Sequence, residues 1–177
     1  MSGIAAVVLA AGASTRFGTP KQQLLLPRVL GRLEPGQFDE LLVVEGAHPL
    51  PGVSPHLPYR LVHCPEWERG TGASLRCGLR ELSAGIEAAV VLLVDGPRVS
   101  PRAIDRVVES WREQGGDLVV ASYGRERGHP LLVARAAWDE IPDEGLRAIE
   151  PRLVPCDDLG APGDVDTPAD LDDLDPE

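Results

Sequence analysis

Residues 4–21 read IAAVVLAAGASTRFGTPK, and this stretch decides the fold. Its first six residues are aliphatic, which predicts a strand buried on both faces, as in a parallel sheet. The strand runs into a loop that combines glycines and hydroxyl side chains with Arg16 and Lys21. Ligands of open α/β sheets bind at the carboxyl ends of strands, where glycine-rich backbone can present N–H groups to phosphate oxygens. The stretch therefore predicts a phosphate-binding loop. It contains neither GxGxxG nor a P-loop sequence, and an ordinary turn with surface charges is the alternative.

The rest of the chain alternates short apolar runs with helical patterns. Leucines recur at helical spacing over residues 75–82, and a second amphipathic pattern over residues 104–111 follows Ser100, the expected N-cap, and Pro101. This alternation predicts an α/β protein with three layers (α/β/α), a mostly parallel central sheet and a Rossmann-like architecture. We expect a short helix within residues 168–174. The further strands are expected at residues 41–45, 59–63, 89–94, 117–122 and 152–155, and the proline-rich residues 48–58 as a loop.

The charge is distributed unevenly along the 177 residues. The formal net charge is −11, but residues 157–177 contain nine acidic and no basic side chains, which leaves only −2 upstream. Residues 1–33 contain four basic and no acidic side chains. This asymmetry favours an anionic ligand near the start of the chain and a cation near its end.

Composition also excludes several classes of partner. The chain has no run of basic residues and only two Phe, two Tyr and three Trp, so we expect no nucleic-acid surface. The early apolar run is too short to span a membrane and no basic segment precedes it, so we expect no membrane partner and a cytoplasmic location. Cys64, Cys77 and Cys156 form neither a CxxC nor a zinc pattern, and we expect three reduced structural thiols.

Two aspartates follow patterns that place them near the glycine-rich loop. Asp95 comes directly after the apolar residues 90–94, so it is expected at the carboxyl end of a central strand. A carboxylate at that edge is solvated, paired or bound to metal, and a helix or turn cap before Pro97 is the alternative. Asp166, in the sequence DVDTPAD, could likewise cap the helix that begins at Pro168, although Thr167 competes for that role.

Several motifs together resemble the signature of the MobA/MocA-like nucleotidyltransferases, which share the nucleotide-diphospho-sugar transferase fold. The first is LAAGxSxRxGxxK, from Leu9 to Lys21. The others follow in the family's order and spacing: WERGTGASLRCGL at 67–79, LVDGP at 93–97, GHPLLV at 128–133, GLR at 145–147 and DVDTPADL at 164–171.

The resemblance implies one nucleotidyltransferase domain over residues 1–177. It implies transfer of NMP from an NTP to a phosphorylated acceptor, such as the molybdopterin cofactor, with release of pyrophosphate. Asp95 and Asp166 would hold Mg²⁺, which prefers a few hard oxygen ligands supplemented by phosphate and water. A phosphomonoester has a second pKa of about 6, so no general base is needed. Lys21, Arg16 and Asp95 are the implied catalytic set.

The same resemblance assigns the remaining site residues. His129 and Arg147 would contact the acceptor, although His129 could be a structural hydrogen-bonding residue and Arg147 a helix surface charge. Gly72 would let the backbone approach the nucleobase and Ser74 would bind its edge, although Thr71 or Ser74 could simply cap the helix that follows. The implied nucleotide-binding residues are Leu9, Ala10, Ala11, Gly12, Ser14, Thr15, Gly18, Gly72 and Ser74.

The identity of the substrates is less closely defined. Enzymes with LAAG favour CTP and those with LAGG favour GTP, so Ala10 and Ala11 indicate CTP, but methylerythritol-phosphate and sugar-1-phosphate enzymes also carry LAAG. The segment from Gln22 to Phe38 is shorter than the family's and leaves space for little more than two helical turns. This suggests a further alternative, a non-catalytic protein that binds nucleotide or cofactor as a molybdoenzyme maturation partner.

Overall fold

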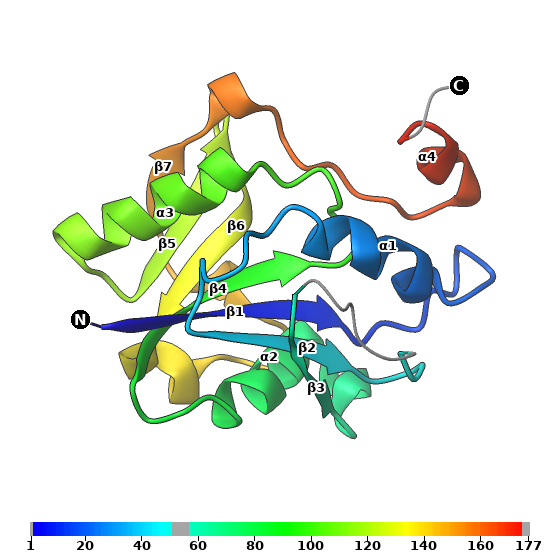
Figure 1. The fold of residues 1–177 in the computed structure, drawn as a ribbon, viewed down its shortest axis with the longest axis horizontal. Coiled ribbons are helices and arrows are strands. Elements are labelled where there is room, and N and C mark those ends of the chain that lie inside the picture. Colours follow the sequence, from blue (N-terminus) through cyan, green and yellow to red (C-terminus); the bar gives the residue numbers. More distant parts are fainter. Residues whose placement is uncertain (1, 51–56, 175–177) are drawn as a thin grey trace.

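The computed structural model describes residues 2–50 and 57–174, so most of the proline-rich stretch lies outside the described residues. The described strands form one seven-stranded sheet in the order β3-β2-β1-β4-β6-β5-β7 (Figure 1). The strands are β1 (Gly3–Ala10), β2 (Glu40–Glu45), β3 (Arg60–His63), β4 (Ile86–Leu93), β5 (Leu118–Tyr123), β6 (Glu126–Ala134) and β7 (Arg152–Pro155).

Helices cover both faces of this sheet, with α1 and α3 on one side and α2 on the other (Figure 1). The predicted three-layer α/β fold with a mostly parallel sheet is confirmed. The helices are α1 (Lys21–Leu30), α2 (Thr71–Arg80), α3 (Pro101–Gln114) and α4 (Pro168–Asp172), and the short 3-10 turns are η1 (Trp67–Arg69), η2 (Arg135–Glu140), η3 (Leu146–Ala148) and η4 (Asp157–Leu159). Within the described residues, no helix is long and apolar enough to cross a membrane.

The central strand β1 shows why the sequence folds this way. Ile4 and Val8 pack into the core beneath α1 and α3, whereas Val7 and Leu9 pack into the core beneath α2. Side chains alternate between the faces of a strand, so a continuous apolar run supplies both cores. β1 pairs in parallel with β2 and β4, and the carboxyl ends of β1 and β4 therefore meet at one edge of the sheet.

Strand β6 was not predicted. It runs antiparallel to both β4 and β5, and a turn at Gly124, whose φ is 66°, joins it to β5. Its first half is polar and includes Pro130, which hides the period of a strand until the apolar run from Leu131 to Val133. This strand brings His129 to the same part of the molecule as the glycine-rich loop.

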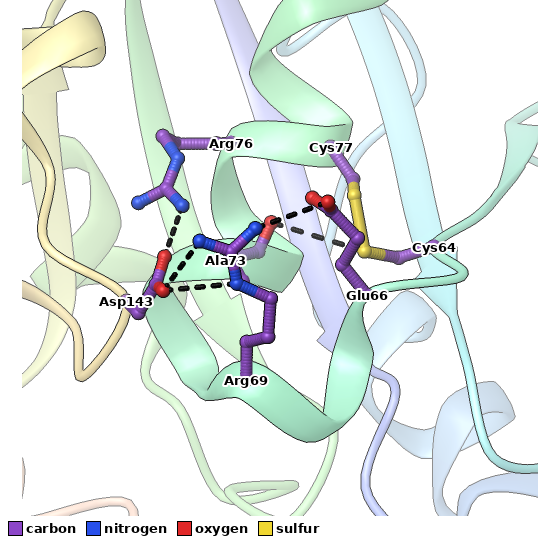
Figure 2. The surroundings of a disulfide bond; sticks show 7 residues. All are labelled: Cys64, Glu66, Arg69, Ala73, Arg76, Cys77 and Asp143. Carbon is purple, nitrogen blue, oxygen red and sulfur yellow. Dashed lines mark hydrogen bonds and ion pairs between the residues drawn. A yellow bond between two sulfur atoms is a disulfide. The ribbon is translucent and has the colours of Figure 1, made fainter.

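Two local expectations need correction. Ser100 is the N-cap residue of α3, but its side chain makes no capping hydrogen bond, and Pro101 alone supplies the expected start signal. Cys64 and Cys77 are not reduced thiols, because they form a disulfide (Figure 2). Cys156 is free and buried, as expected. Their spacing in sequence gave no hint of the pairing, because β3 and α2 bring them together only in the folded chain.

Candidate active site

A cavity of about 420 Å³ lies at the carboxyl ends of β1 and β4. One end of it contains Arg16, Lys21, Asp95 and Asp166, which were all predicted as site residues. The other predicted residues that line it are Leu9, Ala10, Ala11, Gly12, Ser14, Thr15 and Ser74. The fold thus brings most of the site residues predicted from the sequence into one cavity.

The loop after β1 is fixed by a residue that the sequence analysis missed. Gln22 is buried and donates from Nε2 to the Gly12 carbonyl at 2.6 Å, while its Oε1 accepts from the Ser14 hydroxyl at 2.7 Å. Ser14 itself has a φ of 54°, which bends the chain back so that the Phe17 and Gly18 amides reach its carbonyl. Nothing in the sequence distinguishes Gln22 from its exposed neighbour Gln23.

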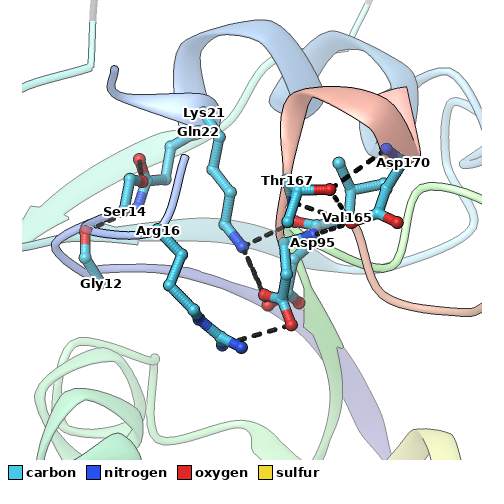
Figure 3. Close-up of polar contacts among 10 residues, drawn as sticks. Gly12, Ser14, Arg16, Lys21, Gln22, Asp95, Val165, Thr167 and Asp170 are labelled. Carbon is cyan, nitrogen blue, oxygen red and sulfur yellow. Dashed lines mark hydrogen bonds and ion pairs between the residues drawn. The ribbon is translucent and has the colours of Figure 1, made fainter. Parts of the chain in front are cut away.

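Lys21 contacts both predicted metal ligands, Asp95 and Asp166. Figure 3 shows its ammonium beside Asp95 and Val165. The Lys21 ammonium donates to Asp166 Oδ1 at 3.0 Å and to the Val165 carbonyl at 2.7 Å, and lies 3.7 Å from Asp95 Oδ2. Arg16 Nη2 lies 3.2 Å from the other carboxylate oxygen of Asp166. The site is therefore a compact group of two carboxylates and two cations that opens into the cavity.

The electrostatics of this group favour an additional cation on Asp95. Burial raises the pKa of Asp95, the nearby Lys21 lowers it, and Asp164 and Asp166 raise it further. The net direction is upward, so Lys21 does not fully compensate for the loss of solvent and the repulsion between carboxylates. Hard oxygen donors in such surroundings fit a divalent cation.

The capping alternatives can now be decided for Asp166 and Ser74. Thr167 caps α4 in a reciprocal capping box with Asp170, which leaves the Asp166 side chain to Lys21 and Arg16. Helix α2 has Gly70 as its N-cap residue, and no side chain caps it. Ser74 is therefore not a helix cap, and it lines the cavity. The Asp95 side chain contacts Lys21.

Gly18 and Gly72 do not line the cavity. Gly18 is exposed, and Gly72 packs against the main chain of Pro142 and Gly145. A Cβ at Gly72 would lie 1.7 Å from the Pro142 carbonyl oxygen and 2.8 Å from the Gly145 nitrogen, which explains the glycine by close backbone packing.

The first cavity is also lined by residues of η1 and the start of α2, namely Trp67, Glu68, Gly70, Thr71 and Ser74. Glu68 was not predicted as a site residue. Among the described residues its side chain forms no hydrogen bond or ion pair, so it is a carboxylate available to accept hydrogen bonds from a ligand. The motif WERG contains it, but its orientation depends on the turn η1.

A second cavity of about 430 Å³ adjoins the first and shares Leu9, Thr71 and Leu93 with it. It contains the two residues predicted to contact the acceptor, His129 and Arg147. The shared wall means that molecules bound in the two cavities lie next to each other.

Side chains of both charges line this second cavity, Arg127 and Arg147 together with the carboxylates of Glu126, Glu144 and Asp164. Arg127, which the sequence analysis missed, donates to the main-chain carbonyls of Leu146 at 3.1 Å, Arg147 at 3.1 Å and Ile149 at 3.3 Å. Burial, followed by the charges of Arg127 and Arg147, lowers the pKa of His129 to about 4. His129 is therefore neutral near pH 7, and Arg127 and Arg147 are the two lining groups that could bind an anion.

An ion-pair network ties the loop that contains Asp143 to η1 and α2 (Figure 2). Asp143 accepts hydrogen bonds from Arg76 on α2 and, at 3.0 Å, from Arg69 Nε on η1, and Arg69 also pairs with Glu66. Hydrogen bonds from Arg76 and Arg69 hold the pKa of Asp143 below its usual value. The Asp143 carbonyl accepts the Gly72 amide at 2.8 Å, so main chain and side chain both tie this loop to the start of α2.

Comparison with known proteins identifies this arrangement. Residues 6–151 match the model of the MobA-like NTP transferase domain. The chain belongs to the MobA-like NTP transferase family. The closing motif with Asp166 lies beyond the matched residues.

Individual relatives agree with this assignment. A "Probable molybdenum cofactor guanylyltransferase" of Chloroflexus aggregans is 32% identical over 132 residues, which are 70% of this chain and 59% of the relative. The chain thus spans little more than half the length of this curated relative. The crystal structure of Rv0371c from Mycobacterium tuberculosis H37Rv has a TM-score of 0.78 and 28% identity, with 97% of each chain covered. A complex of Rv0371c with manganese has a TM-score of 0.73 and 26% identity, again with 97% of each chain covered.

The donor set is consistent with a divalent cation that is shared with a ligand. Among the described residues, no group of three or more His, Cys, Asp or Glu side chains could hold a metal ion by itself. Asp95 and Asp166 supply two carboxylates, and phosphate oxygens and water would complete the coordination that Mg²⁺ requires.

Proposed function

We propose that this chain transfers NMP from an NTP to the phosphate of a molybdopterin-type acceptor and releases pyrophosphate. The observation that carries the proposal is the pair of adjoining cavities. One ends at Lys21 and the two carboxylates, the other contains Arg127 and Arg147, and they share a wall. Two anionic substrates could thus be brought side by side, which is the principal requirement of this reaction.

In the proposed step, an oxygen of the acceptor phosphate attacks the α-phosphorus of the NTP. A new P–O bond forms, the bond to the β-phosphate oxygen breaks, and pyrophosphate leaves with that electron pair. The attacking oxygen is mostly deprotonated near neutral pH because a phosphomonoester has a second pKa of about 6. His129, neutral near pH 7, orients the acceptor as a hydrogen-bonding group and is not required as a base.

The chain's own residues then act by position and charge. Main-chain amides of the loop that Gln22 fixes, together with Arg16, face the triphosphate in this proposal. Asp95 and Asp166 would hold Mg²⁺, which supplies charge stabilisation on the phosphate oxygens when it is bound. Arg147 binds the acceptor anion, and Arg127 holds the loop that carries Arg147.

We infer CTP as the donor from Ala10, Ala11 and Gly12, which match the sequence of cytidylyl enzymes. GTP is the second candidate, supported by the name of the Chloroflexus relative and by Glu68. A carboxylate can accept from cytosine N4, but guanine offers two adjacent donors, N1–H and N2–H₂, to its two oxygens.

The test is pyrophosphate release with Mg²⁺ and each of the four NTPs, against molybdopterin, methylerythritol 4-phosphate and a hexose 1-phosphate. We expect release with molybdopterin, fastest with CTP. Release only with methylerythritol phosphate or a sugar phosphate would replace the acceptor. Tight NTP binding without release from any pair would favour a non-catalytic maturation partner.

The control for this assay is a matched pair of variants. Asp95→Asn should abolish release, whereas Asp158→Asn should not, because Asp158 is an exposed carboxylate that pairs with Arg106 outside both cavities. Equal losses in the two variants would point to an unspecific effect of charge.

A further inference from the structure

The charge of Lys21 is balanced by nearby carboxylates more completely than the charge of Arg16. The residue is only 8% exposed, and its ammonium contacts Val165, Asp166 and Asp95 at 2.7, 3.0 and 3.7 Å. The Arg16 side chain is 74% exposed, and within the described part of the chain it forms one ion pair, with Asp166. The charge of Lys21 is thus already balanced by the two carboxylates, whereas most of the Arg16 guanidinium faces solvent.

This pairing places Lys21 in competition with a divalent cation. The two carboxylates that would hold the cation are those whose charge Lys21 balances. A free cation would meet an ammonium group already beside both carboxylates, and like charges at such distances repel strongly in a partly buried site. A cation that arrives bound to a triphosphate brings an excess of negative charge, which offers Lys21 a new partner.

The fold allows the ammonium to change partners without moving the loop. Lys21 is the first residue of α1 and lines the nucleotide cavity, and its flexible four-carbon chain can carry the ammonium between neighbouring positions. The next residue, Gln22, holds the loop through Gly12 and Ser14 independently of Lys21.

We propose that Lys21 is the internal counter-ion of Asp95 and Asp166, which keeps the free metal ion out and passes to the triphosphate when metal and nucleotide bind together. This inference rests on the proposed function. It gives Lys21 opposite effects on two affinities: it weakens binding of the metal alone and strengthens binding of the metal–nucleotide complex.

The experiment measures both affinities on the same variants. Binding of Mn²⁺ without nucleotide is followed by the EPR signal of the free ion, and binding of Mg²⁺–CTP and Mg²⁺–GTP by calorimetry. The variants are Lys21→Met, which removes the charge, and Lys21→Gln, which also keeps a donor for the Val165 carbonyl if the first variant folds poorly. Arg106→Met, which removes an exposed cation paired with Asp158, is the matched control.

We expect loss of the Lys21 charge to tighten Mn²⁺ binding by at least about tenfold and to weaken Mg²⁺–nucleotide binding by at least about tenfold, with the control unchanged. Mn²⁺ binding that is unchanged or weaker in both folded variants would overturn the inference. The outcome is separable from the proposed function, because tighter Mn²⁺ binding in a protein that transfers no nucleotide would refute the activity and leave the counter-ion role intact.

Discussion

Asp95→Asn removes one carboxylate from the pair at the end of the cavity, and its two expected effects have different signs. At 3.7 Å and an effective dielectric constant of about 20, the attraction between Lys21 and Asp95 is about 4.5 kcal/mol before desolvation. The pKa of Asp95 is nevertheless raised, so burial and the neighbouring Asp164 and Asp166 outweigh this attraction. Stability at pH 7 should therefore hold or rise in the variant, while Lys21 keeps its contacts with Asp166 and Val165.

The effect on transfer should be large. Metal-bound charge stabilisation is worth several kcal/mol, and each 1.36 kcal/mol corresponds to about tenfold in rate, so we expect turnover to fall by at least about 100-fold. The assays are pyrophosphate release and urea unfolding at pH 4 and pH 7. The raised pKa of Asp95 means that the wild type loses stability as pH rises through that value, and the variant does not, so the variant should gain on the wild type between the two pH values.

A turn-capping aspartate would behave differently. Its loss would cost on the order of 1 kcal/mol of stability, or less with Asn, and would leave turnover nearly unchanged. Near-normal pyrophosphate release in Asp95→Asn, with any acceptor that the wild type uses, would refute the reasoning.

The remaining predictions concern binding, pH and metal. Lys21→Ala should weaken NTP affinity by about tenfold or more, and Arg16→Ala by less because Arg16 is largely exposed; isotherms that match the wild type for both variants would contradict a phosphate-binding loop. Because the pKa of His129 is lowered to about 4, the unfolded chain binds more protons between pH 6.5 and 4, so stability should fall as pH decreases through that range; in His129→Gln the plot of melting temperature against pH should be flatter, and an unchanged slope would exclude the assignment. Gln22→Ala should weaken NTP binding with little change in the affinity for free Mn²⁺, since it releases the loop and not the carboxylates; the two titrations distinguish this from a general loss of structure. EDTA should abolish transfer without lowering the melting temperature, because two carboxylates are too few for a structural metal site. A sharp drop in melting temperature would contradict the assignment of Asp95 and Asp166 as ligands of a catalytic metal only.

The parts of the fold that could be predicted are those whose signals are local. The apolar run of β1 and the leucine spacing of α2 identify their elements because both patterns repeat within one element. Strand β6 lacks such a pattern, since its first half is polar, and it is stabilised by pairing with β4 and β5. The disulfide between Cys64 and Cys77 depends in the same way on how β3 and α2 pack.

The same distinction between local sequence signals and contacts made only in the folded chain applies to the candidate site. Arg16 and Asp95 could be placed in one cavity because both follow buried strands that end at the same edge of the sheet. The roles of Gln22 and Arg127 could not, because each depends on hydrogen bonds to main-chain groups of another segment. For Gly72 the sequence analysis predicted a contact with the nucleobase, but the structure explains this glycine by close packing against Pro142.

The most direct test of the central claim follows the label of two NTP preparations, one labelled with ³²P at the α-phosphate and one at the γ-phosphate, in the presence of Mg²⁺ and molybdopterin. Transfer of NMP predicts that the α-label appears in the acceptor product and the γ-label in pyrophosphate, at equal rates and in equal amounts. Appearance of the γ-label in the acceptor, or as inorganic phosphate without pyrophosphate, would show attack at a different phosphorus and contradict the account.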